Sequence, residues 1–185
     1  MTSPSEKTDA SIFLKNGASD FIAKPFSKEE LICRVNNTIE AMENINKIAN
    51  FANRDFLTGA YNRRFFYQDI EEYVQAAEEL DEPYAFAMLD IDHFKKINDT
   101  YGHDGGDKIL KSLAKILTDN TKGRDVVARF GGEEFCVVLK KIAKEEAIKF
   151  FVNLRAKVAE NEVIIKDKII RVTVSIGISF GKGHC

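Results

Sequence analysis

The feature that most constrains the fold is a pair of short apolar runs, residues 126–128 and 135–139, joined through Gly131-Gly132-Glu133-Glu134. Glycines in such a connection permit the positive φ values of a tight turn and allow a second backbone or a ligand to approach closely. The pattern therefore predicts a β-hairpin. Two carboxylates at its turn suit a hard cation, but they suit a solvated hairpin tip equally well. These residues alone leave both interpretations open.

The other apolar patterns predict an α+β fold, a mainly antiparallel sheet with packed helices. The predicted elements are a helix over 65–80, an apolar strand over 84–91, helices beginning near Phe94 and Gly102, a helix over 145–159, a hairpin over 163–170 and an alternating strand over 172–178.

The N-terminal segment shows a different pattern. A helix is predicted over 4–16 and a short strand over 20–23, and Ser27 with Glu30 forms a capping box for a long helix. That helix carries a heptad seam, formed by Leu31, Val35, Thr38, Met42, Ile45, Ala49 and Ala52. Such a seam indicates a parallel coiled coil that joins two copies of the chain. The alternative is a helix that lies on its own domain.

A second acidic stretch begins at the end of the predicted strand over 84–91. Asp90 and Asp92 alternate there, so they point to the same side unless the chain turns between them. Magnesium sites typically use one or two carboxylates, and Asp90 with Glu133 would supply them if their strands are neighbours. The helix start that follows, with Lys95, favours phosphate. The alternative is that the acids cap the helix and the lysines are solvated.

Composition excludes several classes of function. The 185 residues carry a net charge of −2, which does not support a nucleic-acid-binding face. No apolar run approaches the roughly 20 residues that span a bilayer, and the N-terminus has no secretory pattern, so no membrane partner is expected. Cys33, Cys136 and Cys185 lack metal-ligand spacing, and this usage suggests the reducing cytoplasm.

Several ordered motifs resemble the GGDEF family of diguanylate cyclases, over about residues 53–181. They are Asp55-Phe56-Leu57-Thr58-Gly59 with Asn62-Arg63-Arg64, Asp90-Ile91-Asp92 with Phe94-Lys95 and Asn98-Asp99, Tyr101-Gly102-His103 with Gly106-Asp107, Arg129, Gly131-Gly132-Glu133-Glu134-Phe135, and Ser175-Ile176-Gly177. The resemblance implies a palm-like, nucleotide-cyclase-like domain over 53–185. It also implies condensation of two GTP molecules into cyclic di-GMP and two pyrophosphates, with Mg²⁺ or Mn²⁺ as cofactor.

The resemblance also implies a role for each matching residue. Asp90, Glu133 and Lys95 would be catalytic. The metal would be held by Asp90, the Ile91 carbonyl and Glu133, with Glu134 as a possible helper. The substrate would be bound by Phe94, Lys95, Asn98, Asp107, Gly131 and Gly132. Asn98 and Asp107 would read the guanine edge, while Phe94 and Lys95 would hold phosphates.

Residues 1–45 resemble the C-terminal part of a two-component receiver domain, an α/β fold. The matching residues are Gly17-Ala18, Asp20-Phe21-Ile22 and Lys24-Pro25-Phe26. The resemblance implies a response regulator whose linker helix, over 27–52, holds two cyclase domains together as a homodimer. The receiver family's phosphoacceptor pocket lies upstream of the matched residues, so we do not expect this segment to act as a phosphoswitch.

Two departures from the cyclase family affect the expected activity. Its product-inhibition site begins with an arginine, whereas Lys122 stands here with Asp125, and Arg124 is a possible substitute. Since lysine lacks the planar fork of arginine, we expect weaker product inhibition. The family also continues beyond Ser175-Ile176-Gly177 with a phosphate-binding helix and a final strand, whereas this sequence ends at Cys185. The alternative function is therefore a catalytically impaired module that binds GTP or cyclic di-GMP.

Overall fold

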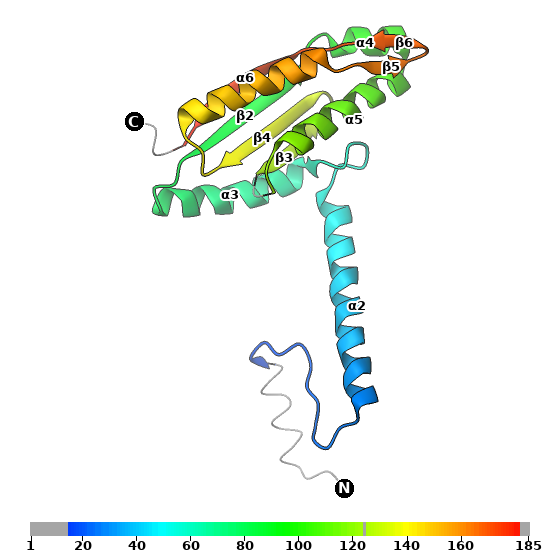
Figure 1. Cartoon of the computed structure of the whole chain (residues 1–185), viewed down its shortest axis with the longest axis vertical. Helices are drawn as coiled ribbons and strands as arrows, with labels where there is room; N and C mark the ends of the chain where they lie inside the picture. Colours follow the sequence, from blue (N-terminus) through cyan, green and yellow to red (C-terminus); the bar gives the residue numbers. More distant parts are fainter. Residues whose placement is uncertain (1–14, 124, 182–185) are drawn as a thin grey trace. The chain divides into compact units, whose positions relative to one another are not determined.

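The structure is a computed structural model that describes residues 15–123 and 125–181 (Figure 1). The chain divides into two compact units at the junction of Ala52 and Asn53. Within the described ranges, no helix is both long enough and apolar enough to cross a lipid bilayer. The helix predicted over 4–16 and the residue Arg124 lie largely or wholly outside these ranges.

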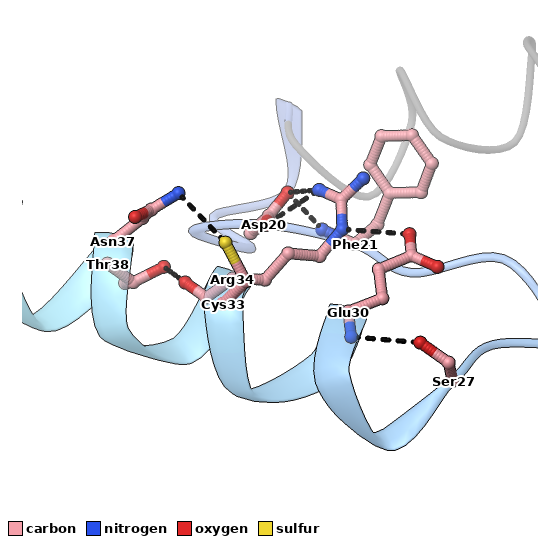
Figure 2. A network of polar contacts seen from close by, with 8 residues as sticks. All are labelled: Asp20, Phe21, Ser27, Glu30, Cys33, Arg34, Asn37 and Thr38. Carbon is pink, nitrogen blue, oxygen red and sulfur yellow. Dashed lines mark hydrogen bonds and ion pairs between the residues drawn. The ribbon is translucent and has the colours of Figure 1, made fainter.

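In the N-terminal unit, helix α2 spans Lys28–Asn53, and its start follows the predicted cap. The Glu30 amide donates to Ser27 Oγ at 3.0 Å. The Glu30 carboxylate does not complete the capping box but accepts from Arg34 Nε at 3.4 Å. Arg34 also reaches Asp20 at 2.9 Å, which ties the segment before the helix to α2 (Figure 2).

The strand predicted over 20–23 is wrong. These residues belong to neither sheet of the described chain. Asp20 instead accepts a hydrogen bond from the amide of Phe21 at 2.8 Å, and its carboxylate pairs with Arg34. A short apolar run forms a strand only where a neighbouring strand completes its hydrogen bonds. The described part of this unit offers no such neighbour.

The C-terminal unit contains a five-stranded sheet in the order β1-β3-β4-β2-β7. All neighbours pair antiparallel except β1 and β3. The strands are β1 Tyr61–Asn62, β2 Tyr84–Ile91, β3 Val126–Gly131, β4 Glu134–Lys140 and β7 Val174–Phe180. A separate hairpin joins β5, Val163–Ile165, to β6, Lys168–Ile170. This architecture confirms the predicted α+β class, whereas the two-residue strand β1 was not predicted.

Helices cover both faces of this sheet. Their bounds are α3 Arg63–Glu79, α4 Phe94–Tyr101, α5 His103–Asn120 and α6 Lys144–Glu160. The main core packs α5 and α6 against Ala85, Ala87, Leu89 and Ile91 of β2 and their neighbours. Figure 1 shows α5 and α6 crossing this face of the sheet. A smaller cluster around Phe66 of α3 covers the opposite face at β3 and β4.

Burial along β2 alternates more strictly than the nearly continuous apolar run suggested. Ala85, Ala87, Leu89 and Ile91 are buried, whereas Phe86 and Met88 on the opposite face are only half-buried. An antiparallel sheet can leave one face partly open to solvent, and this is the face on which Asp90 lies. Asp90 is therefore exposed at the end of the strand and not enclosed in the core.

Candidate active site

The predicted hairpin is confirmed, and its register fixes the place of each acid. Gly131 pairs with Glu134 across the β3–β4 ladder, so Gly132 and Glu133 form the turn. Gly131 and Gly132 have φ values of 155° and 51°, which favour glycine. Glu133 consequently lies at the tip of the hairpin, while Glu134 is the first residue of β4.

The turn places its carboxylates beside Asp90. In the β2–β4 ladder Asp90 lies directly opposite Glu134, so the neighbouring strands expected from the sequence are present. Partial desolvation, followed by the negative charges of Glu133, Glu134 and Asp92, raises the pKa of Asp90 above its usual value. These carboxylates repel one another, and a divalent cation would relieve that repulsion.

The acidic cluster fits the small ligand demand of magnesium. Among the described residues, no group of three or more His, Cys, Asp or Glu side chains has the arrangement of a complete metal site. Magnesium typically takes one or two carboxylates and completes its shell with water and substrate phosphates. Asp90 and Glu133 suit that requirement. The Ile91 side chain is a buried hydrocarbon without ligand atoms, so the residue could contribute only its carbonyl oxygen.

A bridging arginine holds the hairpin turn in place. Arg129 donates from Nε and Nη2 to the carbonyl of Gly132, at 3.0 and 2.8 Å. Its Nη1 pairs with Asp55 at 3.1 Å, and both side chains are partly buried. Burial alone would raise the pKa of Asp55, but hydrogen bonds from Thr58 and Arg129 outweigh it and lower that pKa. The Asp55 motif thus braces the turn that carries Glu133.

The start of α4 offers amide groups for an anion. Its N-cap residue, His93, is left-handed with φ 60°, and its side chain makes no capping hydrogen bond. The first amides of a helix lack partners within the helix and favour negative charge. Phe94 is buried, so only its backbone could face a ligand, whereas the side chain of Lys95 is exposed.

The two residues expected to read a base lie on neighbouring helices, Asn98 on α4 and Asp107 on α5. The helices approach closely because Gly106 has no side chain. A β-carbon at Gly106 would lie 2.0 Å from Asn98 Oδ1 and 3.0 Å from Phe94 Cζ. The structure therefore places the Asn98 amide directly against the residue that precedes Asp107.

Lys122 and Asp125 lie away from the acidic cluster. Asp125 directly precedes β3, whereas Gly131 ends it, so about 20 Å of strand separates the two sites. Both Asp125 carboxylate oxygens accept backbone amides, from Lys122 at 2.8 Å and Lys140 at 3.0 Å. The two residues also line a surface pocket of about 440 Å³ together with Lys140 and Lys149.

Sequence reasoning missed the structural roles of several residues. In the sequence Arg129 belongs to a motif, but its pairing with Asp55 spans 74 residues and leaves no local signal. Gly106 also belongs to a sequence motif, but the motif does not reveal its contact with Asn98. The sequence places Asp92 beside Asp90, yet its carboxylate accepts hydrogen bonds from Thr173 and Ser175 of the last strand region. A polar residue at a strand end was the available signal, but it does not reveal the partner.

Comparison with known proteins identifies the family to which this chain is similar. A family model described as "Diguanylate cyclase, GGDEF domain" matches residues 52–184. The chain is 32% identical over 193 residues to the response regulator PleD of Caulobacter vibrioides, covering 100% of this chain and 42% of that protein. It is 35% identical over 139 residues to diguanylate cyclase A of Treponema denticola, covering 74% of this chain and 38% of that protein. It thus spans less than half the length of both relatives.

A solved structure shows the same fold. The coiled coil and GGDEF domain of DgcB from Caulobacter crescentus, in complex with c-di-GMP, superposes with a TM-score of 0.73 at 26% identity. The match covers 84% of this chain and 83% of that one. The sheet order, the acidic hairpin opposite Asp90 and the extent of the family match lead to one assignment: the chain belongs to the GGDEF family of diguanylate cyclases.

Proposed function

We propose that this chain condenses two GTP molecules into cyclic di-GMP and two pyrophosphates. The observation that carries the proposal is the carboxylate cluster of Asp90, Glu133 and Glu134, close in sequence to the uncapped start of α4. Neighbouring acids that raise the pKa of Asp90 suit a bound cation, and free helix amides suit the phosphates that accompany it. Membership in the family supports the same activity.

The chain's own residues bind and orient the substrate in this proposal. The first amides of α4 and Lys95 hold phosphate oxygens, while Asn98 and Asp107 pair with the guanine edge. Asp90 and Glu133 hold Mg²⁺ or Mn²⁺, which would lower the pKa of the attacking 3′-hydroxyl and stabilise the leaving pyrophosphate. Each 3′-oxygen forms a bond to the α-phosphorus of the other nucleotide, pyrophosphate departs, and the hydroxyl proton passes to solvent.

The cyclic product requires two domains, because one site holds one GTP and two phosphodiester bonds form. Helix α2 supports a homodimer. Its predicted seam partly faces its own chain, since Leu31, Val35 and Thr38 line a pocket with residues 19–22. An overlapping stripe of the same heptad spacing is exposed: Ile32, Val35, Ile39 and Met42, of which Val35 and Ile39 also line that pocket. We propose that two copies pair through this stripe, which raises the effective concentration of the second domain.

We also propose that the chain acts in the cytoplasm as the output part of a response regulator. One relative that carries the name response regulator, PleD, aligns with all of this chain, including the residues before Ala52. The proposed domain limits remain those expected from the sequence, with receiver-like residues 1–45, a linker helix over 27–52 and a cyclase domain over 53–185.

Weak product inhibition is a further part of the proposal. Lys122 offers a single ammonium group where an arginine fork would bind in two places, and the Asp125 carboxylate is occupied by backbone amides. Titration of cyclic di-GMP into a turnover assay measures the effect. Inhibition at low micromolar concentration would contradict this proposal.

The test of the activity is chromatography of the products after incubation with GTP and Mg²⁺. The matched control is Glu133→Gln, which keeps the size of the turn residue and removes its charge. Cyclic di-GMP from the parent alone supports the cyclase. Calorimetric GTP binding without product from either chain would instead support the binding-module alternative.

A further inference from the structure

Asp92 makes a two-sided contact where β2 passes into α4. Its amide donates to the Thr173 carbonyl at 3.0 Å, which extends the β2–β7 pairing by one step. Its two carboxylate oxygens accept from two hydroxyl groups, Thr173 Oγ1 at 2.5 Å and Ser175 Oγ at 2.7 Å. Each carboxylate oxygen of Asp92 thus accepts one hydroxyl, from Ser175 of β7 or from Thr173 directly before it.

This contact lies next to the acidic cluster. In the β2–β7 ladder Ser175 is directly opposite Asp90, and Val174 is opposite Ile91. Asp90 is therefore flanked by Glu134 on one side and by Ser175 on the other. The hydroxyl that lies opposite Asp90 reaches past it to bind Asp92.

The same contact directly precedes the strained start of α4. His93 follows Asp92 in the left-handed region, with φ 60°, and supplies no side-chain cap. A non-glycine residue holds that conformation only where its surroundings determine it. The amides of Lys96 and Ile97 both bond to the His93 carbonyl, so the direction of the first helical turn depends on this residue.

We propose that Asp92, Thr173 and Ser175 form a clamp that positions Asp90 and the phosphate-binding start of α4 relative to each other. Asp92 is then a positioning residue and not a metal ligand, and the proposal rests on the cyclase function proposed above. Both hydroxyl residues are exposed, so the clamp contributes little to the core.

The test compares Thr173→Val with Ser175→Ala, alone and together. Ser179→Ala is the matched control, because Ser179 lies on the same exposed face of β7 but pairs with Phe86, away from the site. The double variant should lower kcat on the order of 10-fold, as loss of residues that orient metal ligands typically does. Hydrogen exchange at Lys96 and Ile97 should become faster, with the melting temperature unchanged. Thr173→Ser, which keeps the hydroxyl, should retain the kcat and the exchange rates of the parent.

A second comparison separates positioning from general damage. In an Asp92→Ala background, removing either hydroxyl should have no additional effect on kcat, because the clamp is already open. Unchanged kcat and unchanged exchange in the double variant would overturn the clamp, as would equal losses in Ser179→Ala. Hydrogen exchange needs no substrate, so it tests the clamp even if the parent makes no cyclic di-GMP. A parent that makes no cyclic di-GMP would refute only the proposed function.

Discussion

At the scale of single residues, the chain concentrates negative charge where folding alone would avoid it. Asp90 lies opposite Glu134 and near Glu133, and these neighbours raise its pKa. An acid whose pKa is raised on folding opposes folding once it ionises. This arrangement is reasonable for a site that binds a cation and is difficult to explain for a merely structural hairpin.

Asp90→Asn should therefore stabilise the chain at neutral pH in the presence of a chelator. The melting temperature should rise relative to the parent at pH 7, and the difference should vanish as the pH falls below the ordinary value of 3.8, where the parent acid is also protonated. Added Mg²⁺ should raise the melting temperature of the parent only. A lower melting temperature for the variant at pH 7 would contradict the charge repulsion.

Gly106 should affect base recognition because the Asn98 amide occupies the space of its missing side chain. Gly106→Ala forces Asn98 aside, so KM for GTP should rise about 10-fold, the size of losing one hydrogen bond to a substrate. Gly123→Ala is the control, since a β-carbon there meets no atom within 4 Å. An unchanged KM for GTP in Gly106→Ala would show that Asn98 takes no part in base recognition.

At the scale of elements, the turn at Gly132 is held from outside its own hairpin. Arg129 connects the Gly132 carbonyl to Asp55, which lies just after the end of α2. The brace links the beginning of the C-terminal unit to the position of Glu133. Its loss should therefore affect both folding and catalysis.

Arg129→Lys should destabilise the chain by about 1–2 kcal/mol, because an ammonium group lacks the planar fork whose separate nitrogens donate to the carbonyl and the carboxylate. The pKa of Asp55 is lowered, so its contribution is present above 3.8 and disappears as the pH falls through the lower folded value. Asp55→Asn should accordingly cost stability at pH 7 but little in strong acid. Urea unfolding at both pH values measures this.

The control for the brace is Lys115→Met, which removes an exposed ion pair with Asp119. Surface pairs of this kind contribute at most about 0.5 kcal/mol. If Arg129→Lys and Lys115→Met cost the same, the brace has no special role.

Sequence patterns predicted the elements whose signal is local. The alternating residues of β7 and the two glycines of the hairpin sufficed for their strands. The pairing of Arg129 with Asp55, or of Asp92 with Ser175, joins residues 74 and 83 positions apart and leaves no local pattern. The strand predicted over 20–23 is wrong for the opposite reason: its apolar pattern is local, but a strand also needs a neighbouring strand with which to pair.

At the scale of the whole molecule, the proposed mechanism depends on two copies of the chain. Ile39→Glu should disrupt pairing through the exposed stripe of α2, because charge at a heptad seam is destabilising. Specific activity should then fall at low protein concentration and recover at high concentration. Asn36→Glu, which adds the same charge at an exposed position beside the stripe, is the control. The dimer proposal would be contradicted if the parent sediments as a monomer and still has full specific activity.

The most direct test of the central claim is a ³¹P NMR time course of the parent chain with GTP and Mg²⁺. Attack on the α-phosphate predicts two pyrophosphates for each cyclic di-GMP, a single phosphodiester resonance, and no reaction after addition of a chelator or in Glu133→Gln. Release of orthophosphate with GDP would show hydrolysis at the γ-phosphate and would contradict the account.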